Sequence, residues 1–174
     1  MRDIGSGAAI FGCAGSSLGA DEAAFFRDYN PFGFILFARN IQTPAQVARL
    51  CDDLRTAVGR RAPILIDQEG GRVQRLRAPH WQDWPAPLDM LVQTGAQGAR
   101  ALQLRTQIIS AELLALGIDT NCAPVADIAG PATHPFLHNR CYGTNAPDVT
   151  ALARVVADTH LACGVLPVIK HIPG

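Results

Sequence analysis

The segment after the apolar run Pro63-Ile64-Leu65 concentrates polar side chains in ten residues, Ile66-Asp67-Gln68-Glu69-Gly70-Gly71-Arg72-Val73-Gln74-Arg75. It contains two carboxylates, two glycines and two arginines. Such a set could form a charged surface turn, a phosphate cradle or one wall of a polar binding site. The phosphate cradle is excluded, because the segment has neither the G-x-x-x-x-G-K-[ST] pattern nor the G-x-G-x-x-G spacing.

Ionisable or polar residues also follow other apolar runs of the chain. Arg39-Asn40 follows the apolar run at 34–37, Asp127 follows the segment 118–125, and Lys170-His171 follows the apolar run at 165–169. The carboxyl ends of parallel strands meet on one rim, where active sites of open sheets and barrels lie. Carboxylates accept hydrogen bonds, whereas arginine and lysine donate them, so this rim suits a ligand rich in hydroxyl groups. Because no phosphate cradle is present, a sugar fits better than a nucleotide.

Each of these residues also has a plainer interpretation. Asp67 and Glu69 could cap the turn, and Arg72 and Arg75 could be solvated surface residues. Arg140 lies in a predicted loop and could be a surface charge.

Lys170 is harder to explain in this way, because a lysine at the end of a buried strand needs an acidic or polar partner. His134 and His138 are interpreted as loop residues, since no H-x-x-x-H helix supports a metal site.

The elements that must position these residues alternate between strands and helices. We expect strands at 8–13, 34–37, 64–66 and 165–169, a less regular extended segment at 118–125, helices at 21–29, 43–58, 95–116 and 148–163, and loops at 78–87 and 129–135. The second helix has the strongest start, with Thr43 as cap, Pro44 in the first turn and Gln46 placed to complete a capping box. Nearly continuous apolar strands alternating with helices predict a parallel sheet covered on both faces, with about five strand–helix units. Doubly wound sheets and barrels share this pattern.

Composition limits the class of protein. The chain has 174 residues, 48% of them hydrophobic and 17% charged, and its formal net charge is zero. It is therefore a globular chain with no electrostatic preference for nucleic acid or an anionic membrane. No apolar run approaches the roughly 20 residues that span a bilayer, and the N-terminus is a poor signal peptide. Five cysteines without a C-x-x-C pair suggest reduced, buried thiols and a cytoplasmic protein.

The chain stops at Lys170-His171-Ile172-Pro173-Gly174, directly after a predicted buried strand. A parallel strand needs a crossover or covering helix. We therefore expect residues 1–174 to form a single, incomplete domain that continues beyond Gly174.

Several segments together resemble the glycoside hydrolase family 3 β-N-acetylhexosaminidases. They occur in family order across nearly the whole chain, and the D-Q-E-G-G-R-V-Q-R segment is the most specific of them. The matching segments are Gly33-Phe34-Ile35-Leu36-Phe37-Ala38-Arg39-Asn40, Ile66 to Arg75 as quoted above, Ala123-Pro124-Val125-Ala126-Asp127, Asn139-Arg140-Cys141-Tyr142-Gly143 and Lys170-His171-Ile172-Pro173-Gly174. Ile172 replaces the phenylalanine of the family pattern and keeps the position apolar.

The resemblance implies the N-terminal portion, about five strand–helix units, of a (β/α)8 TIM-type barrel that binds a terminal N-acetylglucosamine. It implies sugar binding by Asp67 as acceptor, by Arg75, Lys170 and His171 as donors, and by Arg140, which completes the clamp. It implies a retaining exo-β-N-acetylglucosaminidase that acts on GlcNAc-1,6-anhydro-muropeptides in cytoplasmic peptidoglycan recycling, with no cofactor, no metal and no obligate protein partner.

No catalytic residue is assigned within the chain. The resemblance places the histidine–aspartate acid/base pair and the aspartate nucleophile beyond Gly174, so a protein that ends there is expected to be inactive. Its unpaired strand edges would also make it poorly stable. Asp67 and Glu69 do not qualify as the catalytic carboxylates, because they lie two residues apart on one segment and a glycosidase pair flanks the bond from opposite sides.

Two other functions remain open from the residues. One is a Schiff-base lyase or aldolase with Lys170 as nucleophile, which borohydride trapping would detect. The other is a sugar-binding protein that keeps the rim and lacks catalytic loops. A downstream H-G-x-[TS]-x-x-D-[ST]-H stretch would favour the hydrolase over the binder.

Overall fold

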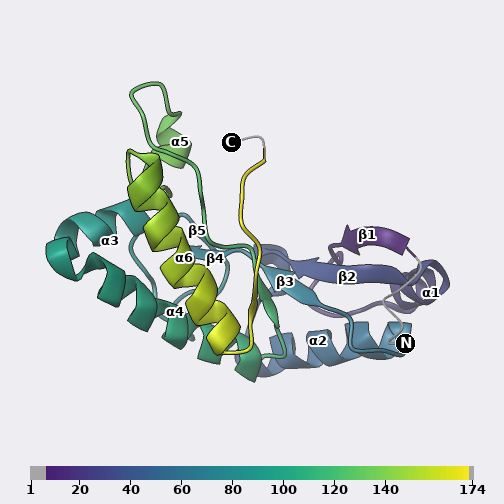
Figure 1. The fold of residues 1–174 in the computed structure, drawn as a ribbon. Helices are drawn as coiled ribbons and strands as arrows, with labels where there is room; N and C mark the ends of the chain where they lie inside the picture. The colour runs from purple at the N-terminus through teal and green to yellow at the C-terminus, as the bar shows by residue number, and fades with distance from the viewer. Residues whose placement is uncertain (1–6, 173–174) are drawn as a thin grey trace. The chain divides into compact units, whose positions relative to one another are not determined.

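The computed structural model describes residues 7–172. The chain divides into two compact units, Met1–Ile66 with Leu113–Thr120 and Asp67–Glu112 with Asn121–Gly174 (Figure 1). The N-terminal segment before Gly7 and the last two residues of the Lys170–Gly174 motif lie outside the described residues. The predictions made for them are therefore not addressed by the structure.

The first unit is built on three parallel strands, β1 (Gly7–Phe11), β2 (Pro31–Leu36) and β3 (Ile64–Ile66), hydrogen bonded in that order. The register of the second pair sets Phe34 opposite Ile64 and Leu36 opposite Ile66. All four of these side chains are fully buried, as expected for a parallel sheet covered by helices. The short 3-10 helix η1 (Ala38–Asn40) follows β2.

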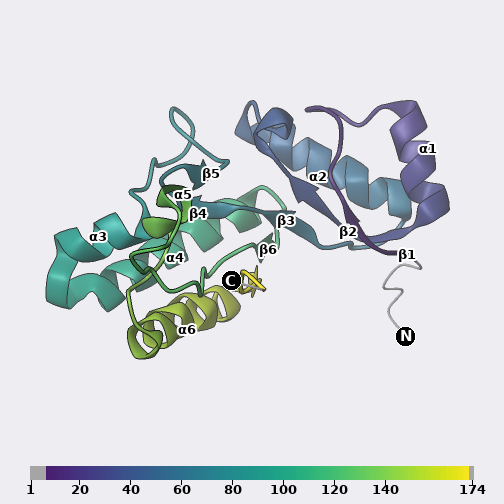
Figure 2. The same cartoon turned by 90° about the horizontal axis from the view of Figure 1, so that it is seen from above.

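Helices α1 (Ala20–Tyr29) and α2 (Pro44–Val58) connect these strands (Figure 2). Asn30 ends α1 in the left-handed conformation, and Gly59 ends α2 in the same way with φ 64°. Thr43 caps α2 as predicted, since its hydroxyl accepts from the Gln46 amide at 3.3 Å. The prediction that Gln46 completes a capping box is wrong, however. Its side chain accepts from the backbone amide of Gln42, at 2.8 Å, and not from that of Thr43.

The second unit begins with a hairpin that the sequence did not predict. Strands β4 (Gln68–Gly70) and β5 (Val73–Gln74) pair antiparallel. Gly70 and Gly71 form the turn with φ 107° and 60°. A side chain at Gly70 would lie 2.6 Å from the carbonyl oxygen of Pro85, so this turn requires glycine.

Four helices complete this part of the chain. They are α3 (Pro87–Thr94), α4 (Gly98–Ala115, whose last turn belongs to the first unit), α5 (Pro135–His138) and α6 (Ala146–Ala162), with the 3-10 turn η2 (Gly95–Gln97) between the first two. A buried apolar cluster packs α3, α4 and α6 together: Met90, Leu102, Tyr142, Ala153 and Val156. The sequence did not predict α3, because prolines and tryptophans just before it suggested a loop. The loop prediction for 129–135 meets α5 only at its last residue.

The extended segment 118–125 contains only a short strand, β6 (Thr120–Asn121). The strand expected at 165–169 is shorter than predicted and forms only β7 (Leu166–Pro167). Strand β6 has Thr120 in the first unit and Asn121 in the second. The prediction of an α/β fold with a mainly parallel sheet is confirmed.

The cysteine side chains are free, and most of them are buried. Cys13, Cys51, Cys122 and Cys141 are buried, and all five cysteines are free. Burial raises the pKa of Cys51 to about 12 and of Cys122 to about 11, so these thiols are poor nucleophiles. Within residues 7–172, no helix combines the length and the apolar character needed to cross a membrane.

Candidate functional site

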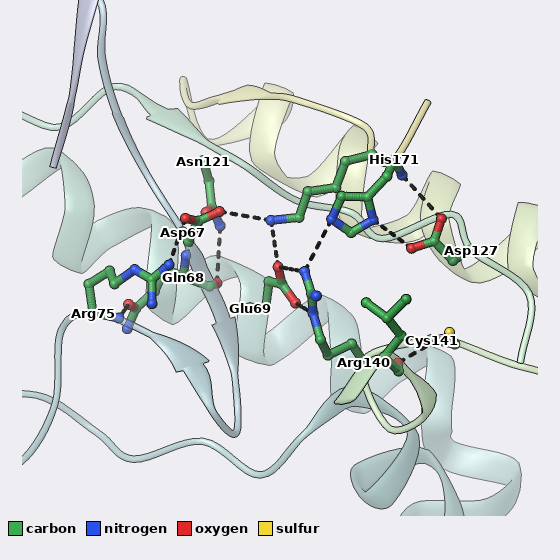
Figure 3. A network of polar contacts seen from close by, with 11 residues as sticks. Asp67, Gln68, Glu69, Arg75, Asn121, Asp127, Arg140, Cys141 and His171 are labelled. Atoms are coloured by element: carbon green, nitrogen blue, oxygen red, sulfur yellow. Dashed lines mark hydrogen bonds and ion pairs between the residues drawn. The ribbon is translucent and has the colours of Figure 1, made fainter. Parts of the chain in front are cut away.

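The site lies in the second unit and is built around the segment that carries Asp67 and Glu69 (Figure 3). Asp67 lies between two cations, with the Lys170 ammonium 2.8 Å from Oδ1 and the Arg75 guanidinium 2.9 Å from Oδ2. Lys170 comes from the segment after β7, and Arg75 follows β5. Lys170 thus has the acidic partner that its position at a strand end requires.

Glu69 is the centre of this cluster. From the sequence, Glu69 was interpreted only as a residue that could cap the turn. Its carboxylate accepts two hydrogen bonds from Arg140, both 2.8 Å long, and lies 2.5 Å from the Lys170 nitrogen. The Glu69 side chain is 1% exposed. Residues two apart on an extended segment point to the same face, so the spacing of Asp67 and Glu69 at the end of an apolar run was the signal that could have revealed this pair.

His171 is oriented by Asp127. Its Nδ1 lies 2.5 Å from Asp127 Oδ2, and its backbone amide donates to Oδ1 at 3.2 Å. Its Nε2 lies 3.2 Å from an Arg140 nitrogen. Because arginine only donates, Nε2 is the acceptor here, and Nδ1 carries the ring proton and donates a hydrogen bond to Asp127. The sequence treated Asp127 only as a rim residue, and the structure makes it the partner that orients His171.

Burial and charge act in opposite directions on the carboxylate of Asp67. Burial would raise its pKa, but the hydrogen bond and charge of Lys170, followed by those of Arg75, outweigh that effect and lower the pKa. The hydrogen bonds to Glu69 raise the pKa of Arg140. Both groups are therefore charged in the folded protein at neutral pH.

The whole cluster is balanced in charge. Three carboxylates, of Asp67, Glu69 and Asp127, face the three cations of Arg75, Arg140 and Lys170, with His171 neutral in the tautomer described above. Such a site offers many donors and acceptors without a net charge, which suits an uncharged ligand with several hydroxyl groups.

A cavity of about 770 Å³ borders the site at Asp127 and His171. Its other walls include Ile128, Thr133, His134 and Leu137. Among residues 7–172, no group of three or more histidine, cysteine, aspartate or glutamate side chains could hold a metal ion.

All five residues predicted for sugar binding meet in one cluster. Arg72 does not join it, and donates instead to Asn139 at 3.1 Å. Arg39, in the first unit, donates to the carbonyl of Cys13 at 3.0 Å.

The charge-balanced polar cluster follows the ends of parallel strands, and this is the location at which α/β folds bind polar ligands. Comparison with known proteins narrows the class. Residues 14–174 match the glycosyl hydrolase family 3 N-terminal domain. A beta-hexosaminidase of Xanthomonas campestris pv. campestris is 33% identical over 169 residues, and one of Methylococcus capsulatus is 36% identical over 168. Each alignment covers 95% of this chain and 50% or 48% of the relative.

Solved structures agree with this result. NagZ from Neisseria gonorrhoeae in complex with N-trifluoroacetyl-D-glucosamine is 27% identical with a TM-score of 0.88, over 100% of this chain and 52% of that one. A glycoside hydrolase family 3 β-N-acetylglucosaminidase from Paenibacillus sp. is 32% identical with a TM-score of 0.83, over 95% of this chain and 31% of that one. The chain belongs to glycosyl hydrolase family 3, and it spans about half the length of the two beta-hexosaminidases.

Proposed function

We propose that this chain provides the sugar-binding side of a retaining exo-β-N-acetylglucosaminidase. Family membership and the beta-hexosaminidase relatives support a glycoside hydrolase. The ligand named for the Neisseria gonorrhoeae structure, N-trifluoroacetyl-D-glucosamine, supports N-acetylglucosamine as the bound sugar. Because the chain spans about half of the two beta-hexosaminidases, we propose that the acid/base pair and the nucleophile come from sequence outside residues 1–174.

The placement of Asp67 beside Lys170 is the observation that carries this proposal. An ammonium group has three protons. Lys170 donates one to Asp67 and forms an ion pair with Glu69, and we propose that it donates a further one to a ligand oxygen. Each Asp67 oxygen already accepts one bond from a cation and has a further lone pair. A donor and an acceptor side by side match two neighbouring hydroxyls of a sugar ring, and Arg75 and Arg140 extend the clamp with further N–H groups. His171 was expected to be a donor to the sugar, but its two ring nitrogens are engaged by Asp127 and Arg140, so we propose that it supports the clamp by holding Arg140.

Such contacts can contribute to catalysis as well as to binding. The sugar ring of a glycosidase substrate distorts toward an oxocarbenium-like transition state. Hydrogen bonds that Asp67 accepts and Lys170 donates would lower the barrier if they shorten during this distortion, whereas bonds of equal strength in both states would lower KM alone.

The finer proposal concerns the substrate. We infer that the aglycone is the 1,6-anhydro-muramyl part of a GlcNAc-1,6-anhydro-muropeptide, and that the protein acts in cytoplasmic peptidoglycan recycling. The free, mostly buried thiols fit a reducing compartment.

The test is an assay of the full-length protein with an aryl β-N-acetylglucosaminide, an aryl β-glucoside and a GlcNAc-1,6-anhydro-muropeptide. The proposal expects hydrolysis of the first and third with retention of anomeric configuration. Hydrolysis of the aryl β-glucoside alone would refute it, and cleavage of the aryl N-acetylglucosaminide without the muropeptide would refute only the assigned aglycone.

The two rival functions are not favoured. A Schiff-base enzyme needs a lysine nitrogen that is free to attack a carbonyl, whereas the nitrogen of Lys170 contacts two carboxylates at 2.8 and 2.5 Å. A sugar-binding protein without activity would bind N-acetylglucosamine and fail to hydrolyse any of the three substrates.

A further inference from the structure

A series of buried hydrogen bonds runs from helix α4 through helix α6 to strand β4, which carries Glu69 and directly follows Asp67. Its members are Ser110 on α4, His160 on α6, Asn121 on β6 and Gln68 on β4, and each is at most 1% exposed. All four belong to the second unit. None was singled out from the sequence as a functional residue.

The donors and acceptors in this series determine the state of the histidine. The Asn121 side chain accepts from the Gln68 amide at 3.0 Å and donates to the Gln68 carbonyl at 3.2 Å. Its second N–H points at His160 Nε2, 3.1 Å away, so Nε2 is the acceptor and Nδ1 carries the proton. That Nδ1 lies 2.9 Å from the Ser110 hydroxyl, which donates to the Thr106 carbonyl at 2.7 Å. The arrangement works only with a neutral ring protonated on Nδ1.

The Gln68 end of this hydrogen-bond series reaches the sugar clamp, which we define as Asp67, Arg75, Arg140, Lys170 and His171. The Gln68 side chain accepts from the amides of Arg75 and Leu76, both at 3.0 Å, and donates to the Leu76 carbonyl at 3.0 Å. Gln68 therefore holds both ends of the hairpin segment together. Asp67 and Glu69 are the neighbours of Gln68 in the sequence. The hydrogen bonds that hold the backbone of Gln68 therefore also position the backbone from which these two carboxylate side chains extend.

We propose that His160 is a positioning residue for the sugar clamp. From helix α6 its ring holds the amide of Asn121, which in turn holds the peptide of Gln68 between the two carboxylates. An apolar side chain at this position would leave the second Asn121 N–H buried without a partner and free the amide to move. The inference rests on the proposed sugar-binding function, because it concerns the same clamp.

The experiment compares three variants of the full-length protein. His160→Leu removes both ring nitrogens, and His160→Gln keeps one donor and one acceptor. Thr159→Val is the matched control, because the Thr159 hydroxyl is buried on the same helix and bonds to the Val155 carbonyl at 2.6 Å within that helix. For each variant the dissociation constant of N-acetylglucosamine is measured well below its Tm.

His160→Leu should weaken binding of N-acetylglucosamine about tenfold, the equivalent of one lost buried hydrogen bond. His160→Gln should recover most of that loss, and Thr159→Val should bind as the wild type does. Wild-type affinity in His160→Leu would overturn the proposal. Should His160→Leu not fold, Ser110→Ala, which removes only the far partner of the ring, must weaken binding more than Thr159→Val does, and equal affinities would overturn it.

Amide hydrogen exchange separates this inference from the proposed function, because it needs no sugar. The amides of Arg75 and Leu76 should exchange faster in His160→Leu than in Thr159→Val, and equal rates would overturn the link from His160 to the clamp. A wild-type protein that fails to bind N-acetylglucosamine would instead refute the proposed function.

Discussion

The buried ring of His160 should make the stability of the protein sensitive to mild acid. Burial lowers its pKa from 6.5 to about 4 in the folded protein, and its neighbours Ser110 and Asn121 carry no charge to offset that effect. Between those two values the unfolded chain takes up a proton that the folded protein does not. Proton uptake therefore lowers the free energy of the unfolded state relative to the folded state as pH falls, and stability is lost from pH 6.5 downward.

The size of the effect follows from the two pKa values. The difference between a pKa of 6.5 in the unfolded chain and about 4 in the folded protein corresponds to about 3 kcal/mol of the free energy of unfolding. This full amount is lost only below the lower pKa. At about pH 7 little of it is lost, because the unfolded histidine is still mostly neutral. At about pH 5 the unfolded histidine is charged and the folded one is not, so about 2 kcal/mol of the free energy of unfolding should be lost between these two conditions.

The measurement is urea unfolding of the wild type and of His160→Gln at about pH 7, 6 and 5. Other groups titrate alike in both proteins, so their contributions cancel in the difference. The stability advantage of the wild type over His160→Gln should shrink by about 2 kcal/mol across this range. A difference that stays constant with pH would refute the reasoning, and Thr159→Val should show a constant difference as control.

Three further predictions concern the site. Glu69→Ala should lower the free energy of unfolding by about 3–5 kcal/mol, because it leaves two cations without their shared carboxylate; Asp83→Ala, which breaks an exposed ion pair, should cost at most about 1 kcal/mol in the same urea experiment. Gly70→Ala should lower the free energy of unfolding by more than about 1 kcal/mol, because residue 70 has a φ of 107° and a Cβ there would meet the carbonyl of Pro85. An unchanged Tm would contradict this. Binding of N-acetylglucosamine should persist down to about pH 4 and decline below it, because the pKa of Asp67 is lowered from 3.8 and its ion pairs are lost only as pH falls through the folded value. Titration of the dissociation constant against pH checks this, and Asp67→Asn should bind more weakly at every pH.

Much of the local structure was predictable, because its causes act within a few residues. The start of α2 follows from Thr43 and Pro44, and its end from Gly59. The strand at Ile64–Ile66 was predicted with the same bounds. The length of the last two strands was not, because an apolar run shows that a segment is buried and does not show how many of its residues find a hydrogen-bonded neighbour.

Helix α3 and the β4–β5 hairpin were missed for a related reason. Proline suggested a loop before 88, although Pro87 opens α3 in a position that proline suits. The hairpin is held by the Gln68 side chain, which bonds to a backbone amide seven residues away. No short pattern in a single sequence reports such a contact.

The sequence by itself determined the fold class and the polar residues at the strand ends, because hydrophobic periodicity, caps and a specific motif are written in neighbouring positions. Only the tertiary structure decided how those residues are paired. Glu69 and Arg140 are 71 residues apart, and His160 reaches Asn121 across 39. The return of the chain brings these groups within hydrogen-bond distance, and burial then makes each of them depend on its partner.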